Sequence, residues 1–201
     1  PRYRRLGCRP AEQFVPQLMA HLGEPYYAGL LTSARYHGAG HQAPMVFQVM
    51  VPKLRRGLEC GEVRVDFAAR HDMEQTPVVE RNTETGILRI ASAEATALEL
   101  VCYPQHCGYL DNVATVLAEL AEVVDGEVLA AEAGRAPLAW VQRLGFLLIR
   151  VEADEVAAHL DAVVEARGAF PVALASWKDM TGAPRDARWK VAVNIDVEPD
   201  L

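Results

Sequence analysis

Hydrophobic residues in the first part of the chain recur with a helical period and then with a strand period. Between residues 11 and 22, Phe14, Leu18 and Leu22 lie four positions apart, which predicts a helix, although Pro16 lies inside it and limits its continuity. Residues 26–37 predict a second helix, ended by the glycines of the Gly38–Ala39–Gly40 sequence. Three later segments are continuously apolar or alternate, and they predict strands over 45–51, 62–68 and 86–91.

Helical periodicity dominates the second half of the chain. Ser92 is a good N-cap for a helix over 94–101. Three further segments carry an apolar stripe, at 111–124 with Asp111 as its cap, 138–149 and 155–166. We expect these helices to share one core, formed by Leu117, Leu120, Leu144, Leu147, Leu160 and Val163. Residues 189–197 alternate again, which predicts a late strand that returns to the sheet.

This order of elements predicts an α+β fold with a mixed or antiparallel sheet and a helical layer. The length of 201 residues and the 51% of hydrophobic residues suit a globular protein with a proper core. We expect residues 1–10 to be a tail or linker and residues 11–201 to form the main domain. Because the chain opens on Pro1 rather than Met, we expect a fragment of a longer protein.

The number of cysteines and the length of the apolar runs indicate the cellular compartment in which the protein works. The four cysteines, Cys8, Cys60, Cys102 and Cys107, are too few and too scattered for a secreted disulfide framework, so we expect free thiols. No apolar run approaches the roughly 18 residues that a membrane helix needs. We therefore expect a cytoplasmic protein without a membrane partner.

The charge of the chain is divided unevenly. Residues 1–90 hold 12 Lys and Arg against 9 Asp and Glu, a net charge of +3, whereas residues 91–201 hold 8 against 18, a net charge of −10. A basic first part suits an anionic partner such as nucleic acid or an acidic protein. The overall charge of −7 argues against a general nucleic-acid coat.

Two groups of residues have the types that bind metals. His37 and His41 lie four apart, but Gly38 and Gly40 make a continuous helical face between them unfavourable. Cys102, His106 and Cys107 offer two thiols and an imidazole, one ligand short of a structural zinc site. We expect no metal at either place, with the histidines closing a helix end and the thiols buried.

An enzymatic alternative rests on carboxylates. Asp66, Glu94, Asp196 and Glu198, with Lys190 to hold a phosphate, could serve a metal-dependent nuclease or phosphodiesterase if they converged. The common reading of such residues is a solvated strand face. The chain also lacks the familiar glycine-rich nucleotide motifs and hydrolase motifs, so we expect no cofactor and no enzymatic activity.

Four segments together resemble a known family. They are YYAGLLTSARYHGAGHQAPMVFQVMV, GILRIASAEATALELV, LDNVATVLAELAE and VQRLGFLL, in this order. They resemble the C-terminal domain of AbiEi-family antitoxins, the transcriptional regulators of bacterial type IV toxin–antitoxin, or abortive infection, systems. The resemblance spans about residues 2–197. Its most specific pieces are the Tyr-Tyr, Gly-Leu-Leu, His-Gly-Ala, His-Gln and Phe-Gln-Val elements and the Ala-Thr-Ala-Leu helix, and they include Tyr26, Tyr27, His37, Gly38, His41 and Gln42.

The resemblance implies both partners and a division of labour. The resemblance implies that family members consist of an N-terminal winged helix-turn-helix followed by this larger domain. The winged helix is absent from this sequence, so we expect promoter DNA to be bound through the missing domain. The second implied partner is a nucleotidyltransferase-like toxin whose effect the protein counteracts. Function is then expected on a surface rather than in a pocket.

The expected surface is basic. Lys53, Arg55 and Arg56 follow the predicted strand 45–51, and Arg64 points from the solvent side of the next strand. The tail adds Arg2, Arg4 and Arg5, close to the missing DNA-binding domain.

Overall fold

The computed structural model describes residues 8–40 and 46–200, which fall into two compact units. One unit, called the sheet unit below, runs to Tyr36 and resumes after residue 40 up to Ser92; the other, the helical unit, comprises His37–Gly40 and everything from Ala93 onward. The boundary at residue 92 follows the change of charge in the sequence. The sheet unit therefore carries the net charge of +3 and the helical unit the net charge of −10.

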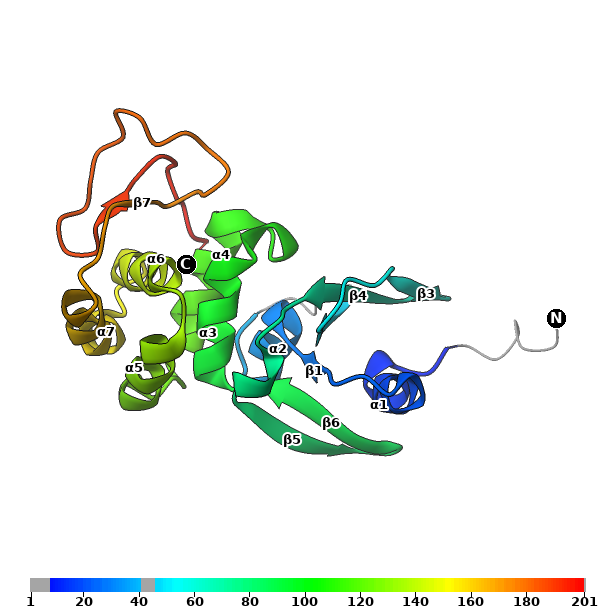
Figure 1. The fold of residues 1–201 in the computed structure, drawn as a ribbon. Coiled ribbons are helices and arrows are strands. Elements are labelled where there is room, and N and C mark those ends of the chain that lie inside the picture. The colour runs from blue at the N-terminus through cyan, green and yellow to red at the C-terminus, as the bar shows by residue number, and fades with distance from the viewer. Residues whose placement is uncertain (1–7, 41–45, 201) are drawn as a thin grey trace. The chain divides into compact units, whose positions relative to one another are not determined.

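The sheet unit is built on a six-stranded sheet (Figure 1). Its strands are β1 (Tyr27–Ala28), β2 (Val46–Val51), β3 (Leu58–Cys60), β4 (Val63–Ala69), β5 (Val78–Thr83) and β6 (Gly86–Ala91), and the 3-10 turn η2 (Met73–Gln75) lies between β4 and β5. They are arranged in the order β3-β4-β2-β1-β6-β5, with β2–β4 and β1–β6 parallel and the other pairs antiparallel. The mixed sheet confirms the predicted α+β class. Strands β3 and β5 were not predicted, since short exposed edge strands lack an apolar pattern.

Helix α1 (Ala11–Leu22) packs on one face of this sheet and runs without a break through Pro16. Its buried residues are Ala11, Val15 and Met19, which meet Leu88 and Ile90 of β6 in one apolar core. The predicted apolar stripe is displaced by one residue from the buried face. Its members at 14 and 18 are only partly buried, and the leucine at 22 is exposed. Burial of a whole face offsets the backbone hydrogen bond that proline removes.

The predicted helix over 26–37 is wrong in its first turn. Tyr27 and Ala28 form β1, and helix α2 is confined to Leu30–Tyr36. Pairing decided this outcome, because Tyr27 lies opposite Met50 and Ala28 lies between β2 and β6. The predicted end of the helix at the two glycines is confirmed, since Gly38 and Gly40 have φ angles of 88° and 110°, which only glycine adopts readily.

The corner between β1 and α2 is fixed by Gln48, a buried polar residue of β2. Its side-chain Oε1 accepts a hydrogen bond of 2.9 Å from the N–H of Leu31, and its own N–H donates to Thr32 Oγ1 at 2.8 Å. Its carbonyl accepts from the N–H of Gly29 at 3.2 Å. Gln48 thus satisfies donors at the start of α2 that no helical partner can reach.

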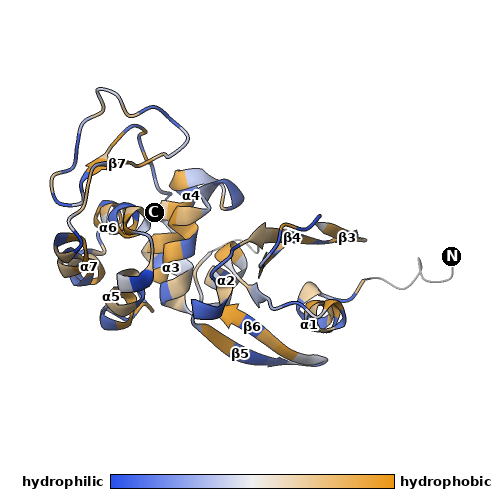
Figure 2. Cartoon of the chain, in the orientation of Figure 1, coloured by the Kyte–Doolittle hydropathy of each residue, from blue (hydrophilic) through white to orange (hydrophobic). Residues whose placement is uncertain are grey.

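Five α-helices make up most of the helical unit. They are α3 (Ala93–Cys102), α4 (Tyr109–Leu120), α5 (Gly126–Arg135), α6 (Leu138–Arg150) and α7 (Asp154–Ala166), with the short 3-10 turn η3 (Pro104–His106). Residues 93–101 of α3 are buried all round, in keeping with its largely apolar colouring in Figure 2. No helix in the described parts of the chain is long and apolar enough to cross a membrane.

The predicted helical core is nearly correct. Leu117, Leu120, Leu144, Leu147 and Leu160 are buried, whereas on α7 Val164 takes the place predicted for Val163. Helix α5 was missed because its alanine-rich sequence has only a weak apolar stripe. Asp111, predicted to be the N-cap, lies inside the first turn of α4. The N-cap position is occupied by Gly108.

The late strand is much shorter than predicted and does not join the main sheet. Only β8 (Val191–Ala192) forms, and it pairs in parallel with β7 (Val172–Ala173) as a separate two-stranded sheet. Trp189 just before it is buried across Gly145 of α6, where an added Cβ would collide with the indole. Gln142 of α6 donates to the carbonyls of Phe170 and Trp189, so backbone that lacks strand partners is satisfied by a helix side chain.

The expectation of four free thiols is wrong for one pair. Cys8 and Cys60 form a disulfide with their Cα atoms 5.6 Å apart. They are 52 residues apart in sequence, and only the edge position of β3 brings Cys60 beside the segment before α1. Cys102 and Cys107 form no disulfide; Cys107 is buried as predicted, whereas Cys102 is partly exposed.

Leu117 tests the shared helical core. Its side chain is 1% exposed on α4, so Leu117→Ala leaves a cavity and should lower the free energy of unfolding by about 2–5 kcal/mol. Val123→Ala, at a residue that is 52% exposed, should change it by less than about 0.5 kcal/mol. Urea unfolding followed by circular dichroism measures both. Equal effects of the two substitutions would contradict the packing described for α4.

Candidate functional site

The predicted basic surface lies on the loop between β2 and β3. Lys53 and Arg56 are exposed, and neither forms an ion pair with any residue in the described ranges. Leu54 between them is 79% exposed. Because β3 runs antiparallel to β4, the chain turns back after this loop along the edge of the sheet, with Leu58 opposite Val65.

Arg55 differs from its neighbours because it is held by a carboxylate. Its guanidinium binds Glu24 through two hydrogen bonds, Nε to Oε2 at 2.9 Å and Nη2 to Oε1 at 2.6 Å. This bond lowers the pKa of Glu24 and raises the pKa of Arg55. Arg55 therefore anchors the loop to the segment after α1, while Lys53 and Arg56 remain available to a partner.

Of the other basic residues predicted for this surface, the structure describes only Arg64. Arg64 of β4 is exposed and lies 3.7 Å from Glu59 of β3, directly opposite it in the register. Arg2, Arg4 and Arg5 lie outside the described residues. Lys53, Arg55 and Arg56 thus share the loop 52–57, whereas Arg64 lies opposite β3, and the interaction surface as a whole stays a prediction.

Two of the residues that carry the family resemblance are tyrosines with a structural role in the sheet unit. Tyr26 donates to the carbonyl of Ile87 at 3.3 Å, and Tyr27 donates to Thr76 Oγ1 at 3.4 Å. Both rings are buried, and burial raises the pKa of Tyr26. His37 directly follows α2, whereas His41 and Gln42 lie outside the described residues.

The acidic residues of the enzymatic alternative are engaged locally. Asp66 belongs to the sheet unit, and Asp196, Glu198 and Lys190 belong to the helical unit. Asp66 and Asp196 each accept a hydrogen bond from the N–H of the next residue. Within residues 8–40 and 46–200, no three His, Cys, Asp or Glu side chains are grouped so that they could hold a metal ion.

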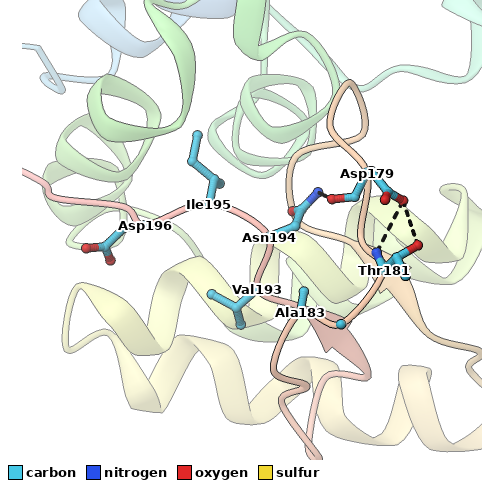
Figure 3. Close-up of a pocket in the computed structure, with 8 residues that line it drawn as sticks. Asp179, Thr181, Ala183, Val193, Asn194, Ile195 and Asp196 are labelled. Carbon is cyan, nitrogen blue, oxygen red and sulfur yellow. Dashed lines mark hydrogen bonds between the residues drawn. The ribbon is translucent and has the colours of Figure 1, made fainter.

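A hollow in the helical unit was not anticipated from the sequence. It measures about 530 Å³ and lies between the loop 179–183 and the segment 193–196. Figure 3 shows Asp179 turned back onto Thr181, whose N–H and hydroxyl both donate to its carboxylate at 3.2 and 3.0 Å. These bonds lower the pKa of Asp179. The only sequence signal was the unusual content of glycine, proline and charge in residues 178–188.

Asn194 holds the loop beside this hollow. Its Oδ1 accepts from the N–H of Ala175 at 2.9 Å, and its Nδ2 donates to the carbonyls of Ala175 and Lys178 at 2.9 and 3.0 Å. A smaller, mainly apolar cavity of about 250 Å³ adjoins the hollow, between Phe146 and Arg150 of α6 and Val193. One amide side chain therefore fixes a loop that has no regular structure of its own.

Removal of the Asn194 amide should release this loop. Asn194→Ala leaves the polar backbone groups of residues 175 and 178 without their partner, which should cost about 1–3 kcal/mol of unfolding free energy. Hydrogen exchange should accelerate at the amide of Ala175, where the bond to Oδ1 is lost. Asn82→Ala, on the exposed edge strand β5, is the matched control. Unchanged exchange at residue 175 would contradict the role assigned to Asn194.

Comparisons with known proteins match the chain to one family. A family model described as the AbiEi antitoxin C-terminal domain matches residues 27–150. No curated protein sequence matches the chain significantly. The crystal structure of the RV2827C protein from Mycobacterium tuberculosis superimposes with a TM-score of 0.57 at 14% identity, over 90% of this chain and 67% of that one. At this identity the likeness shows a shared fold. The matched range contains the basic loop and ends before the hollow.

Proposed function

The chain belongs to the family of AbiEi antitoxin C-terminal domains, which gives it an antitoxin role in a toxin–antitoxin system, and from this premise we propose the finer assignment. The protein counteracts a nucleotidyltransferase-like toxin of a bacterial type IV system and represses its own promoter. It does so in the cytoplasm and without chemistry of its own. The observation that carries the proposal is the family match, which spans β1 to α6 and includes the corner that Gln48 holds.

The distribution of charge supports a division of tasks between the two units. A net charge of +3 on the sheet unit favours approach to DNA, whereas a net charge of −10 on the helical unit opposes it. We assign the loop 52–57 to promoter DNA, where it adds phosphate contacts to those of a winged helix. Phosphate contacts of this kind give affinity and position rather than sequence specificity.

Growth rescue tests the antitoxin assignment. The full-length protein and the toxin encoded beside it are placed under separate inducible promoters in one host. Induction of the toxin alone should stop growth, and induction of both should restore it. A promoter–reporter fusion in the same strains should lose signal when the full-length protein is induced. Persistent growth arrest, with the protein present at levels confirmed by blotting, would refute the assignment.

Charge reversal tests the basic loop. In the full-length protein, Lys53→Glu together with Arg56→Glu should weaken promoter binding and reduce the slope of log K against log salt by about 2, since two phosphate contacts are lost. The melting temperature should fall less than in Arg55→Glu, because neither residue has an ion pair to lose in the described structure and Lys53 only attracts Glu24 from a distance.

Two control variants show whether the effect belongs to this loop. Reversal of Arg35 and Arg89, exposed cations of the same unit outside this loop, changes the net charge equally and should leave the salt slope near the wild-type value. Arg55→Glu should instead lower the melting temperature, because it sets a second carboxylate against Glu24. A wild-type salt slope in the Lys53 and Arg56 variant would remove this loop from the DNA interface.

A further inference from the structure

A disulfide ties the edge of the main sheet to the segment before α1. Cys60 is the last residue of β3, and its partner Cys8 comes just before Pro10, the residue at the N-cap of α1. Figure 1 shows β3 at the edge of the sheet, beside β4, and all three residues of β3 are exposed. An exposed edge strand buries little apolar area, so the covalent link is a main restraint on this edge.

The basic loop 52–57 leads directly into β3. Gly57 closes the loop, and a Cβ added to it would lie 3.0 Å from the carbonyl oxygen of Val65 on β4. The start of the loop is continuous with β2, and its middle is bonded to the segment after α1 through Arg55 and Glu24. The order of the last residues of the loop therefore depends on β3 staying against β4.

Arg56 is the cation that is most sensitive to the position of β3. It is exposed, and it stands between Arg55, which is bonded to Glu24, and Gly57, which lies against β4. While both neighbours are held, its side chain extends from a fixed backbone, which lowers the entropic cost of a phosphate contact. Release of β3 leaves this backbone anchored on one side, so the same contact forms at a greater cost.

The disulfide is accessible to small thiols and disulfides. Cys60 is exposed at the start of the two-residue turn that joins β3 to β4. Exposed disulfides are the labile ones, whereas structural disulfides of secreted proteins resist reduction. In the cytoplasm, where the proposed function places the protein, disulfides are as a rule transient or redox-sensing. Both observations favour a bond that opens and closes.

We propose that Cys8 and Cys60 form a reversible redox switch that sets the affinity of the loop 52–57 for promoter DNA. The disulfide state holds β3 and the end of the loop in place and binds the promoter more tightly. The dithiol state releases them and weakens repression. The inference rests on the proposed function for the DNA contact of this loop, and it adds regulation of that contact by oxidation.

The switch closes by thiol–disulfide exchange with a low-molecular-weight disulfide. The thiolate of Cys60 attacks one sulfur of the small disulfide, and the other sulfur leaves as a thiolate. The thiolate of Cys8 then attacks the Cys60 sulfur of the mixed disulfide, and the second small thiolate leaves. The two protons lost by the cysteines pass to the two small thiolates, so two protein thiols are oxidised and one small disulfide is reduced. The Cα atoms lie 5.6 Å apart, a usual separation for this bond.

Promoter binding by the full-length protein in its two redox states tests the proposal. The protein is incubated with dithiothreitol or with oxidised glutathione, and thiol alkylation followed by mass spectrometry identifies the bonded cysteines. Promoter affinity, measured by fluorescence anisotropy, should be about three- to tenfold weaker in the dithiol state. Hydrogen exchange in the dithiol state should accelerate at residues 56–60 and stay unchanged in the central strand β6.

Three variants assign the effect to this disulfide and this loop. Cys8→Ser with Cys60→Ser should show the weaker affinity under both conditions, with circular dichroism as the check on folding. Cys102→Ser, at a partly exposed cysteine of the helical unit, should keep the full redox response. Arg56→Gln should lose most of the redox response, because the contact that the switch controls is gone.

The outcomes separate the switch from the proposed function. Equal promoter affinity in the two states, with the disulfide shown to be open in one of them, would overturn the switch and leave promoter repression intact. A disulfide that stays closed in excess dithiothreitol would be a structural crosslink only, which also overturns the switch. Absence of promoter binding in both states would refute the assignment of the loop to DNA, and the switch with it. If the serine variant does not fold, the two states of the wild-type protein decide.

Discussion

The arrangement of the sheet unit depends on the corner at which β1 turns into α2. Leu30 enters this corner with a φ angle of 55°, and the first turn of α2 would leave several N–H groups without partners. Gln48 meets this need from the neighbouring strand, with its side chain on Leu31, its N–H on Thr32 and its carbonyl on Gly29. One residue therefore fixes both the start of the helix and the register of β1 against β2, and with them the strand that ends at the basic loop.

In the helical unit the corresponding constraint is close packing around α6. Gly145 makes room for the ring of Trp189, and Gln142 on the same helix satisfies the carbonyl of Phe170 before β7 and that of Trp189 before β8. The segment after α7 is mostly irregular and would expose unsatisfied backbone groups without such contacts. Side chains on a rigid helix and Asn194 on the terminal segment replace the hydrogen bonds of a sheet. They thereby hold the loop that carries Trp177 and Asp179.

The two units carry opposite net charges, +3 on the sheet unit and −10 on the helical unit. The loop 52–57 offers Lys53 and Arg56 from the basic unit, where an anionic partner is favoured. The ring pair of Tyr109 and Trp177 belongs to the acidic unit. Repulsion contributes to specificity as much as attraction does, so the charge of the helical unit would keep an anionic partner of the loop 52–57 away from that unit.

The sequence by itself determined the α+β class, the helices α1, α3, α4, α6 and α7, and the strands β2, β4 and β6, because each of these elements has a strong local periodicity. The motifs of the four segments that resemble the family, rather than periodicity, indicated the family. Tertiary structure decided what periodicity does not encode. Tyr27 became a strand through pairing with Met50, the edge strands formed on neighbours, and Trp189 and the residues after it were held by α6 instead of the main sheet. Arg55 looked equivalent to Arg56 until Glu24 was brought beside it. The contact of Tyr109 with Trp177 likewise joins two segments that no periodicity relates. Such contacts join residues far apart in the chain, and their free energy exists only when the whole chain is folded.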